Sequence, residues 1–297
     1  MNLRPPAPKA GALPGCATPR IPANLIIQSR SLTYDTRRFG GRPTATLLSV
    51  TRVSKRFGGV HALADCTLSV EEGSITGLIG PNGAGKTTLF NVITGLAPAD
   101  GGEIRLGADR LDGLPPHAIA RRGVGRTFQI PRPLSRMTVL ENVMLYAHDQ
   151  PGDRLVHVFT APTRVRAHQH RVRERAHALL ASMDLAHLAD APAATLSGGQ
   201  KKLLELARAL MADPRIILLD EPGAGVNPTL MRSLVETIRA LQREGRTFLL
   251  IEHDMDLVTE LCDPVIVMAQ GRRLVEGPFS TVRRDTRVLE AYLGTIA

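Results

Sequence analysis

A glycine-rich stretch that follows a short apolar run places the strongest limit on how this chain can fold. Residues 80–87 read GPNGAGKT, which fits the pattern G-x-x-x-x-G-K-[ST], and the apolar run SITGLI comes directly before them. Behind the stretch, apolar residues recur at helical spacing, at Leu89, Val92, Ile93 and Leu96. The order of strand, glycine-rich turn and helix predicts an α/β core.

The composition is that of a globular protein. Of the 297 residues, 43% are hydrophobic, enough for one substantial core divided over one or two lobes. The longest uncharged apolar runs fall far short of the ~20 residues that a membrane-spanning helix needs, so no transmembrane segment is expected. The three cysteines, Cys16, Cys66 and Cys262, are widely spaced and fit neither a disulfide framework nor a metal site, which favours a reducing cytosol.

The positive charge is concentrated near the N-terminus. Residues 1–46 carry a net +6 of the chain's +9, together with seven of its 21 prolines and no apolar period, so we expect a disordered basic extension there. A role for this extension at a membrane surface or on RNA is an alternative. The remainder is nearly neutral and the whole chain has few aromatic residues and no tryptophan, so no nucleic-acid partner is expected.

From residue 47 onward the sequence predicts an α/β domain with right-handed crossovers. LLSVTRVSKRF, DCTLSVEEGSITGLIG and GGEIRLGADRL are rich in β-branched residues between glycine turns, which is typical of strands. RIILLD and TFLLIEH are short apolar runs of the kind that a parallel sheet buries on both faces. A helix is expected after Asn227, with Asn227 as its N-cap and Pro228 at its first position.

Residues 132–211 predict an inserted helical lobe, because strand patterns are absent from this part of the sequence. Two helical patterns stand out there, RVRERAHALLASMDLAHL and GGQKKLLELARALM. Lys201, Glu205 and Arg208 in the second are spaced so that they can pair three or four residues apart. Its predicted apolar face consists of Leu203, Leu206, Ala207 and Leu210.

The glycine-rich stretch has the chemistry of a phosphate site. Its glycines allow successive backbone N–H groups to point inward, at the positive end of the helix that follows. We expect Lys86 to reach the β and γ phosphates of a bound nucleotide and the Thr87 hydroxyl to bind Mg²⁺. The residues predicted to hold the nucleotide here are Gly80, Pro81, Asn82, Gly83, Ala84, Gly85, Lys86, Thr87 and Thr88.

Two adjacent carboxylates end the apolar run RIILL. Asp220 is expected to hold Mg²⁺ through water, and Glu221 to orient or deprotonate a water that attacks the γ-phosphate. We expect their side chains to point in different directions because side chains alternate along an extended chain. Ligands bind beyond the carboxyl ends of strands in open α/β sheets, so this pair should meet the glycine-rich loop in one crevice.

The stretch LSGGQ decides the family. It lies some 110 residues after the loop and shortly before RIILLDEP, an order that resembles ABC-type ATPases over essentially all of residues 47–297. The resemblance implies a P-loop NTPase with a RecA-like core, an N-terminal antiparallel β lobe and an inserted helical lobe. It also implies a head-to-tail pair of ATPase subunits, in which the LSGGQ stretch of one covers the ATP on the other. The residues concerned are Ser197, Gly198, Gly199 and Gln200.

Other positions match the family pattern one at a time. Gln129 in RTFQ resembles the glutamine that senses Mg²⁺ and the water and begins the segment facing the membrane partner. His253 in IEHD resembles the histidine that contacts the γ-phosphate. Phe57 stands where an aromatic residue stacks on adenine, with a buried core phenylalanine as the alternative. Asn227, in EPGAGVN, stands where many relatives carry an aspartate that acts across the dimer.

Within this family the sequence is most similar to the longer ATPase subunit of branched-chain amino acid importers. RTFQIPRPLSRMTVLENV, EPGAGVNP, IEHDM and LEAYLG carry that similarity. It implies two transmembrane permease subunits, a second and shorter ATPase, a periplasmic solute-binding protein, and a peripheral position on the cytoplasmic face of the inner membrane. Three alternatives stay open: uptake of urea or short amides, lipopolysaccharide export, and a non-transport ABC ATPase acting on ribosomes or DNA.

Overall fold

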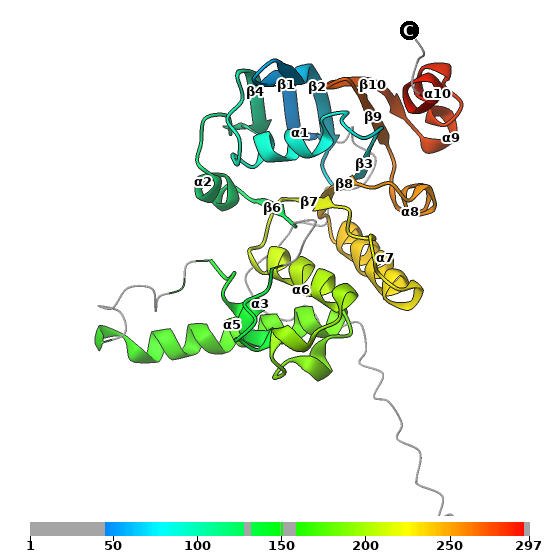
Figure 1. Cartoon of the computed structure of the whole chain (residues 1–297). Coiled ribbons are helices and arrows are strands. Elements are labelled where there is room, and N and C mark those ends of the chain that lie inside the picture. Colours follow the sequence, from blue (N-terminus) through cyan, green and yellow to red (C-terminus); the bar gives the residue numbers. More distant parts are fainter. Residues whose placement is uncertain (1–44, 128–131, 149, 151–158, 294–297) are drawn as a thin grey trace, which may run out of the picture. The chain divides into compact units, whose positions relative to one another are not determined.

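The computed structural model describes residues 45–127, 132–148, 150 and 159–293, and these form two sheets with helices around them (Figure 1). One sheet is antiparallel, with strand order β2-β1-β4-β5. Its strands are β1 (Thr46–Phe57), β2 (Val60–Glu71), β4 (Gly101–Leu106) and β5 (Asp109–Arg110). The strands expected after residue 47 and after the glycine-rich loop are therefore confirmed.

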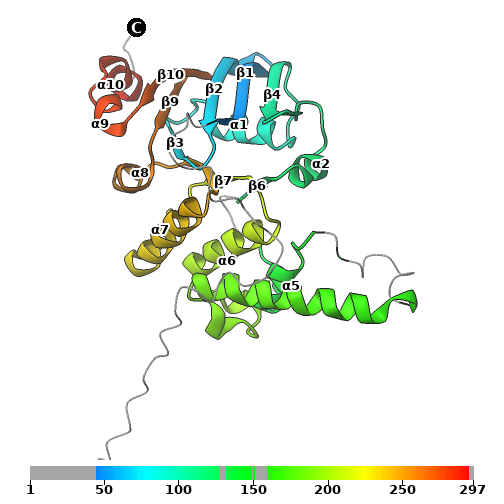
Figure 2. The ribbon, with the colours of Figure 1, turned by 180° about the vertical axis from the view of Figure 1, so that it is seen from behind.

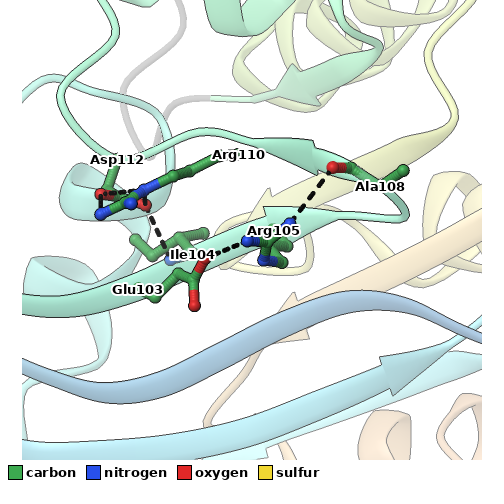
Figure 3. A network of polar contacts seen from close by, with 6 residues as sticks. All are labelled: Glu103, Ile104, Arg105, Ala108, Arg110 and Asp112. Carbon is green, nitrogen blue, oxygen red and sulfur yellow. Dashed lines mark hydrogen bonds and ion pairs between the residues drawn. The ribbon is translucent and has the colours of Figure 1, made fainter.

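The β4–β5 hairpin is held by short-range polar contacts (Figure 3). Arg110 donates to both carboxylate oxygens of Asp112 at 2.7–3.0 Å, and Asp112 Oδ1 also accepts from the Ile104 amide at 3.2 Å. The guanidinium of Arg110, followed by this amide, holds the pKa of Asp112 below its usual range. Asp112 thus ties the end of β5 back to β4, through Arg110 on one side and the Ile104 amide on the other.

The second sheet is largely parallel and matches the predicted core. Its order is β10-β9-β3-β8-β7-β6, and only β10 runs antiparallel to its neighbour. Its strands are β3 (Ile75–Ile79), β6 (Val124–Arg126), β7 (Ile216–Asp220), β8 (Thr247–Ile251), β9 (Val265–Ala269) and β10 (Arg272–Gly277). Every residue of β3, β7 and β8 is buried, as expected for a sheet covered on both faces.

Alternating side chains of this sheet enter two hydrophobic clusters. Leu78, Leu218 and Leu249 pack with α1 and the antiparallel sheet, while Ile79, Leu219 and Leu250 pack with the helices on the opposite face. Figure 2 shows α1 next to β1, β2 and β4 of the antiparallel sheet, whereas α7 and α8 lie away from these strands, next to the parallel sheet. The helices are α1 (Lys86–Ile93), α2 (Pro116–Arg121), α3 (Val139–Met144), α5 (Pro162–Ser182), α6 (Gly198–Met211), α7 (Pro228–Arg243), α8 (Met255–Leu261), α9 (Phe279–Val282) and α10 (Thr286–Leu293).

Helix α1 is shorter than its apolar pattern predicts. It ends at Ile93, and Gly95 adopts a left-handed φ of +72°, so Leu96 lies beyond the helix with 52% of its surface exposed. Leu96 therefore continues the apolar spacing in the sequence but not the helix, because the glycine turns the chain away first. The N-cap of α7 is confirmed: Asn227 Oδ1 accepts from the Leu230 amide at 2.8 Å, with Pro228 at the first helical position.

Two charged residues of α6 are buried where the sequence suggested only helix-face pairing. Glu205 and Arg208 form an ion pair at 2.7 Å and are 7% and 6% exposed. The guanidinium of Arg208 lies 4.4 Å from the ring centre of Tyr146, which follows α3, and also hydrogen-bonds the tyrosine hydroxyl. Burial raises the pKa of Glu205. The pair therefore joins α6 to the end of α3 instead of facing solvent.

Domain limits remain predictions. Residues 132–148, 150 and 159–211 contain helices and turns, with a single isolated bridge between Thr138 and Pro192, in agreement with an inserted helical lobe but without fixing its bounds. The predicted basic extension, residues 1–46, lies almost wholly outside the described residues. Across the part of the chain that the structure covers, no helix is long and apolar enough to cross a membrane. Cys66 and Cys262 are buried free thiols.

Candidate functional site

The glycine-rich loop is held against the backbone of neighbouring strands. A side chain at Gly80 would come within 2.1 Å of the Met268 carbonyl at the end of β9, and one at Gly85 within 2.4 Å of the Ala62 carbonyl in β2. Both glycines have positive φ, +148° and +99°. Because only glycine tolerates both the conformation and the close approach, the sequence fixes the shape of the turn at these two points.

Helix α1 begins directly at the end of this loop, with Lys86 as its first residue. No acidic residue occupies its first turn, so the positive end of the helix is left for an anion. Asn82, Gly83 and Thr87 are exposed, which leaves the backbone of the loop and the Thr87 hydroxyl accessible. The loop thus has the open N–H groups and hydroxyl that a phosphate site needs.

The side chain of Lys86 folds back over the loop. Its ammonium donates to the carbonyls of Gly80 at 2.7 Å and Pro81 at 3.0 Å, and the residue is only 6% exposed. Burial lowers the pKa of Lys86, and the nearby carboxylates of Glu221 and Asp220 partly restore it. All three predicted charged groups therefore lie within electrostatic reach of one another.

Asp220 ends β7 and pairs with Arg126, a residue that had no predicted role. Asp220 Oδ2 lies 3.0 Å from the guanidinium of Arg126 at the end of β6, and both side chains are buried. Arg126 also donates to Asn91 Oδ1 at 2.7 Å and to Thr94 Oγ1 at 3.2 Å on and just after α1. Burial raises the pKa of Asp220, and Arg126 opposes the rise. The sequence signal for Arg126 is its place as a basic residue at the end of one buried strand, when the neighbouring buried strand ends in an aspartate.

Replacing Arg126 by methionine should destabilise the fold, because it leaves a buried carboxylate without its cation. We expect a loss of about 3 kcal/mol in the free energy of unfolding near neutral pH. Burial raises the pKa of Asp220 in the folded state, so in the variant Asp220 becomes protonated, and neutral, as the pH falls. The difference in unfolding free energy between the two proteins should therefore shrink as the pH falls towards the ordinary carboxyl pKa of about 4. Urea titrations of both proteins across this pH range test the prediction; a deficit that does not depend on pH would contradict it.

The structure brings Glu221 and His253 into contact, with a left-handed backbone at Glu221 in place of the extended one that was expected. Glu221 Oε1 lies 3.1 Å from His253 Nε2, with both side chains partly accessible. Glu221 has a left-handed φ of +50°, so it is not extended, and this backbone turn rather than strand alternation separates it from Asp220. Such a conformation costs of order 1–3 kcal/mol for a non-glycine residue and is found preferentially at functional sites.

Neighbouring backbone contacts hold Glu221 in this conformation. Its amide donates to the Ile251 carbonyl at 3.0 Å, and its own carbonyl accepts from Lys202 Nζ at 2.8 Å. The buried Glu252 accepts from the Gly223 amide at 2.7 Å and from the His253 amide at 3.1 Å. No sequence pattern points to Lys202 or Glu252, because their contacts form only when β7, β8 and α6 are assembled.

The LSGGQ stretch forms the start of α6. Ser197 and Gln200 make a reciprocal capping box: Ser197 Oγ accepts from the Gln200 amide at 3.3 Å, and Gln200 Oε1 accepts from the Ser197 amide at 2.9 Å. Gly199 packs so closely on α7 that a side chain there would come within 2.9 Å of Leu230. Ser197 and Gly198 are exposed, so this turn offers a free helix start at the surface.

Of the two remaining predicted residues, the structure describes only Phe57. Phe57 ends β1 with 52% of its surface exposed and the ammonium of Lys55 5.3 Å from its ring centre, so the alternative of a buried core residue is wrong. Phe57 pairs with Val60 at the start of β2. Two residues further along β2, the Ala62 carbonyl lies against Gly85 of the glycine-rich loop. Gln129 lies outside the described residues; Thr127, two residues before it, accepts from the Asp220 amide at 3.4 Å.

Comparison with known proteins identifies the family. The model of the ABC transporter family matches residues 63–224. The chain is 42% identical over 248 residues to the probable branched-chain amino acid transport ATP-binding protein LivG of Archaeoglobus fulgidus, covering 84% of this chain and 95% of that protein. It is also 42% identical over 250 residues to the high-affinity branched-chain amino acid transport ATP-binding protein BraF of Pseudomonas aeruginosa, covering 84% and 98%.

Solved structures agree with this match. A nucleotide-free ATP-binding cassette from an ABC transporter has a TM-score of 0.73 and 38% identity, over 84% of this chain and 100% of that one. An ATP-binding cassette of an ABC transporter in its ADP conformation has a TM-score of 0.71 and 37% identity, with the same coverage. The region matched by the family model includes the loop, the LSGGQ turn and the carboxylate pair. The chain therefore belongs to the ABC transporter family and has the fold of its ATP-binding cassettes.

Proposed function

We propose that this chain is the ATP-hydrolysing subunit of an ABC importer that takes up branched-chain or other hydrophobic amino acids, or related small solutes. The observation that carries the proposal is the meeting of Lys86, Asp220 and Glu221 at the carboxyl ends of β3 and β7, beside the start of α1. Relatives with matching sequence are named as branched-chain amino acid transport ATP-binding proteins. Identity of about 42% over almost their full length supports the same role here.

The geometry supports hydrolysis by in-line attack of water on the γ-phosphate of ATP. The loop amides and the start of α1 would bind the phosphates, and Lys86 would exchange its contacts with the Gly80 and Pro81 carbonyls for phosphate oxygens. Glu221 would accept a proton from the attacking water. His253, 3.1 Å from Glu221, would orient that carboxylate and contact the γ-phosphate.

The oxygen donors at the site suit Mg²⁺, which prefers carboxylate, hydroxyl and phosphate oxygens. We assign the exposed hydroxyl of Thr87 and, through water, the carboxylate of Asp220 as its ligands, with Gln129 as the third predicted contact. Bound Mg²⁺ would neutralise charge on the phosphates during transfer. Arg126 would balance the buried charge of Asp220 when nucleotide is absent.

The exposed start of α6 supports a composite site between two ATPase subunits. Ser197 and the amides after it point a positive helix end outward, where it can approach the γ-phosphate held by a second subunit. A Cβ atom added to Gly198 would meet no described residue outside its own helix turn within 4 Å, so space remains for a ligand to approach its backbone. ATP would then bridge the two subunits, and its hydrolysis would release them. A shorter sister ATPase is the expected partner.

Two exposed leucines support contact with a membrane subunit. Leu134 and Leu145 are 47% and 49% exposed, and Leu145 caps the end of α3. The buried Asn142 fixes the Leu134 turn onto α3, because it accepts from the Leu134 amide at 2.8 Å and donates to its carbonyl at 3.1 Å. Exposed apolar side chains on a backbone that is fixed in this way are suited to a partner surface. We assign this surface to the permease on the cytoplasmic face of the membrane.

Introducing charge on this surface should release the chain from the membrane without affecting ATP binding. We expect Leu134→Arg and Leu145→Arg each to weaken assembly with the permease about tenfold or more, because a charge cannot enter an apolar contact without loss. Leu96→Arg is the matched control, since Leu96 is similarly exposed beyond α1. Recovery of each tagged variant in the membrane fraction measures the effect; equal loss from the Leu96 control would contradict the assignment.

The solute is set by the membrane subunits and the periplasmic binding protein, because the ATPase does not contact it. Branched-chain amino acids are favoured by the named relatives, and uptake of urea or short amides, lipopolysaccharide export and non-transport roles are not. Gentle affinity purification of the tagged chain from detergent-solubilised membranes tests the proposal. Two multi-span proteins and a shorter ATPase should co-purify. Recovery of ribosomes or nucleic acid without membrane proteins would overturn the transport role and leave the ATPase chemistry intact.

A further inference from the structure

One buried arginine of α6 reaches both ends of the chain segment that carries the leucine surface, which consists of Leu134 and Leu145. Arg208 Nη1 donates to the Arg132 carbonyl at 3.4 Å, two residues before Leu134. Its Nη2 donates to the hydroxyl of Tyr146, which directly follows Leu145. A single guanidinium group therefore contacts the chain on either side of the surface that we assign to the permease.

Further contacts fix the orientation of this guanidinium group. Arg208 Cζ lies 4.4 Å from the centre of the Tyr146 ring, and Nη1 also donates to Glu205 Oε2 at 2.7 Å. Glu205 and Arg208 are both buried and lie one turn apart on the same helix. Because a guanidinium group is planar and its donors point at fixed angles, these contacts together define how α6 sits against the segment of the leucine surface.

A buried ion pair of this kind is a weak source of stability. The cost of removing both charges from water can match or exceed their attraction, so apolar residues of similar volume often stabilise a fold as well or better. Arg208 Nε is also buried without a hydrogen-bond partner among the described residues, which adds to the cost. Apolar side chains of α3 and α6 already pack in one cluster, but such packing is not directional. The contribution of the arginine is therefore direction rather than strength.

Helix α6 connects this arginine to the LSGGQ turn. The helix runs without interruption from Gly198 to Met211 after its N-cap Ser197, so Arg208 lies about three turns, or roughly 16 Å, beyond the cap. Figure 1 shows α3 next to α6. A continuous helix is a rigid element, so a displacement of its first turn also displaces Arg208. The segment of the leucine surface is itself held together by the hydrogen bonds of Asn142 and would follow as one piece.

We propose that Arg208 couples the LSGGQ turn to the leucine surface, so that the approach of ATP on a second subunit to the start of α6 shifts the surface that faces the permease. This inference rests on the proposed function, because both ends of the connection are interfaces proposed there. Packed helices can slide past one another, and the angled contacts of the guanidinium group oppose sliding between α6 and the end of α3. Arg208 is a positioning residue, because it acts through Tyr146 and the Arg132 carbonyl.

Hydrogen exchange tests this coupling on the assembled ATPases, without the permease. The two regions compared are amides 198–201, at the LSGGQ turn, and amides 142–146, at the end of α3. Exchange is followed with and without a non-hydrolysable ATP analogue and Mg²⁺. We expect the analogue to slow exchange at the LSGGQ turn, where the second subunit approaches, and to change exchange at the end of α3 by at least about threefold.

Two conservative variants separate coupling from folding. Arg208→Lys keeps a positive charge beside Glu205 but loses the planar set of donors, and Tyr146→Phe keeps the ring but loses the hydroxyl. Arg246→Lys is the matched control, because Arg246 also pairs with a carboxylate, that of Asp213, outside α3 and α6. Thermal melting shows which variants are folded.

The proposal predicts that Arg208→Lys and Tyr146→Phe keep the response of the LSGGQ turn and reduce that of α3 by at least about threefold, whereas Arg246→Lys keeps both. In proteoliposomes, amino acid uptake per ATP hydrolysed should fall by at least about fivefold with Arg208→Lys and stay unchanged in the control. An α3 response that survives in Arg208→Lys, or an equal loss in the control, would overturn the coupling; if Arg208→Lys is unfolded, Tyr146→Phe decides in the same way. If the analogue left the LSGGQ turn of the unmodified ATPases unprotected, the composite site of the proposed function would fail, and the coupling with it.

Discussion

Replacing Glu221 by glutamine should reduce ATP hydrolysis by about a hundred- to ten-thousand-fold, because the amide cannot accept the proton of the attacking water. ATP binding should be retained, since Lys86 and the loop amides are unchanged and glutamine can keep the 3.1 Å contact with His253. Bound ATP that is not hydrolysed should hold two subunits together. Single-turnover hydrolysis and size-exclusion chromatography of the assembled ATPases with ATP measure both effects.

Glu244→Gln provides the matched control, because Glu244 is an exposed carboxylate at the end of α7. It should hydrolyse ATP at the unmodified rate. If Glu221→Gln also retained that rate, Glu221 would not be the base. If it lost ATP binding together with hydrolysis, the Glu221 carboxylate would be needed for the site's architecture rather than for proton transfer alone.

Replacing Lys86 by alanine should abolish nucleotide binding while leaving the fold intact. The ammonium is the only side-chain cation that folds over the described loop, so its loss leaves the β and γ phosphates without their main charge contact. Burial lowers the pKa of Lys86, so keeping the ammonium charged reduces the stability of the folded state. Removing that charge therefore offsets the loss of the two hydrogen bonds to the loop carbonyls. We therefore expect weaker binding by at least about a hundredfold at an unchanged melting temperature.

Equilibrium binding of a fluorescent ATP analogue, with thermal melting in parallel, checks this prediction. Arg232→Ala on the exposed part of α7 is a control for general loss of positive charge. Binding within about twofold of the unmodified protein by Lys86→Ala would contradict the role of Lys86. Loss of binding accompanied by a lower melting temperature would show instead that the lysine supports the loop itself.

Much of the fold was predictable because it depends on local pattern. The apolar runs at β3, β7 and β8 are continuous, so burial on both faces followed directly from their composition. Ser197 and Asn227 are good N-caps by residue type, and both cap helices in the structure. The loop was predictable because its glycines meet a backbone requirement that few other sequences can satisfy.

Features that depend on residues distant in sequence were not predictable in this way. Arg126 lies 94 positions from Asp220, and only the pairing of β6 with β7 brings them together. The burial of Glu205 and Arg208 depends on where α3 packs, which helical spacing does not reveal. Glu221 was expected on an extended backbone and instead has a positive φ, because such a conformation cannot be read from a glutamate in a sequence.

The most direct test of the proposed function is solute uptake by the purified membrane complex in proteoliposomes, with ATP supplied on the side of this chain. Labelled leucine, isoleucine and valine are presented on the opposite side with the co-purified binding protein. We predict ATP-dependent accumulation with the unmodified chain and none with Glu221→Gln. Accumulation that persists with Glu221→Gln or without ATP, or no accumulation of any of the three amino acids, would contradict the proposal that hydrolysis at this site drives their import.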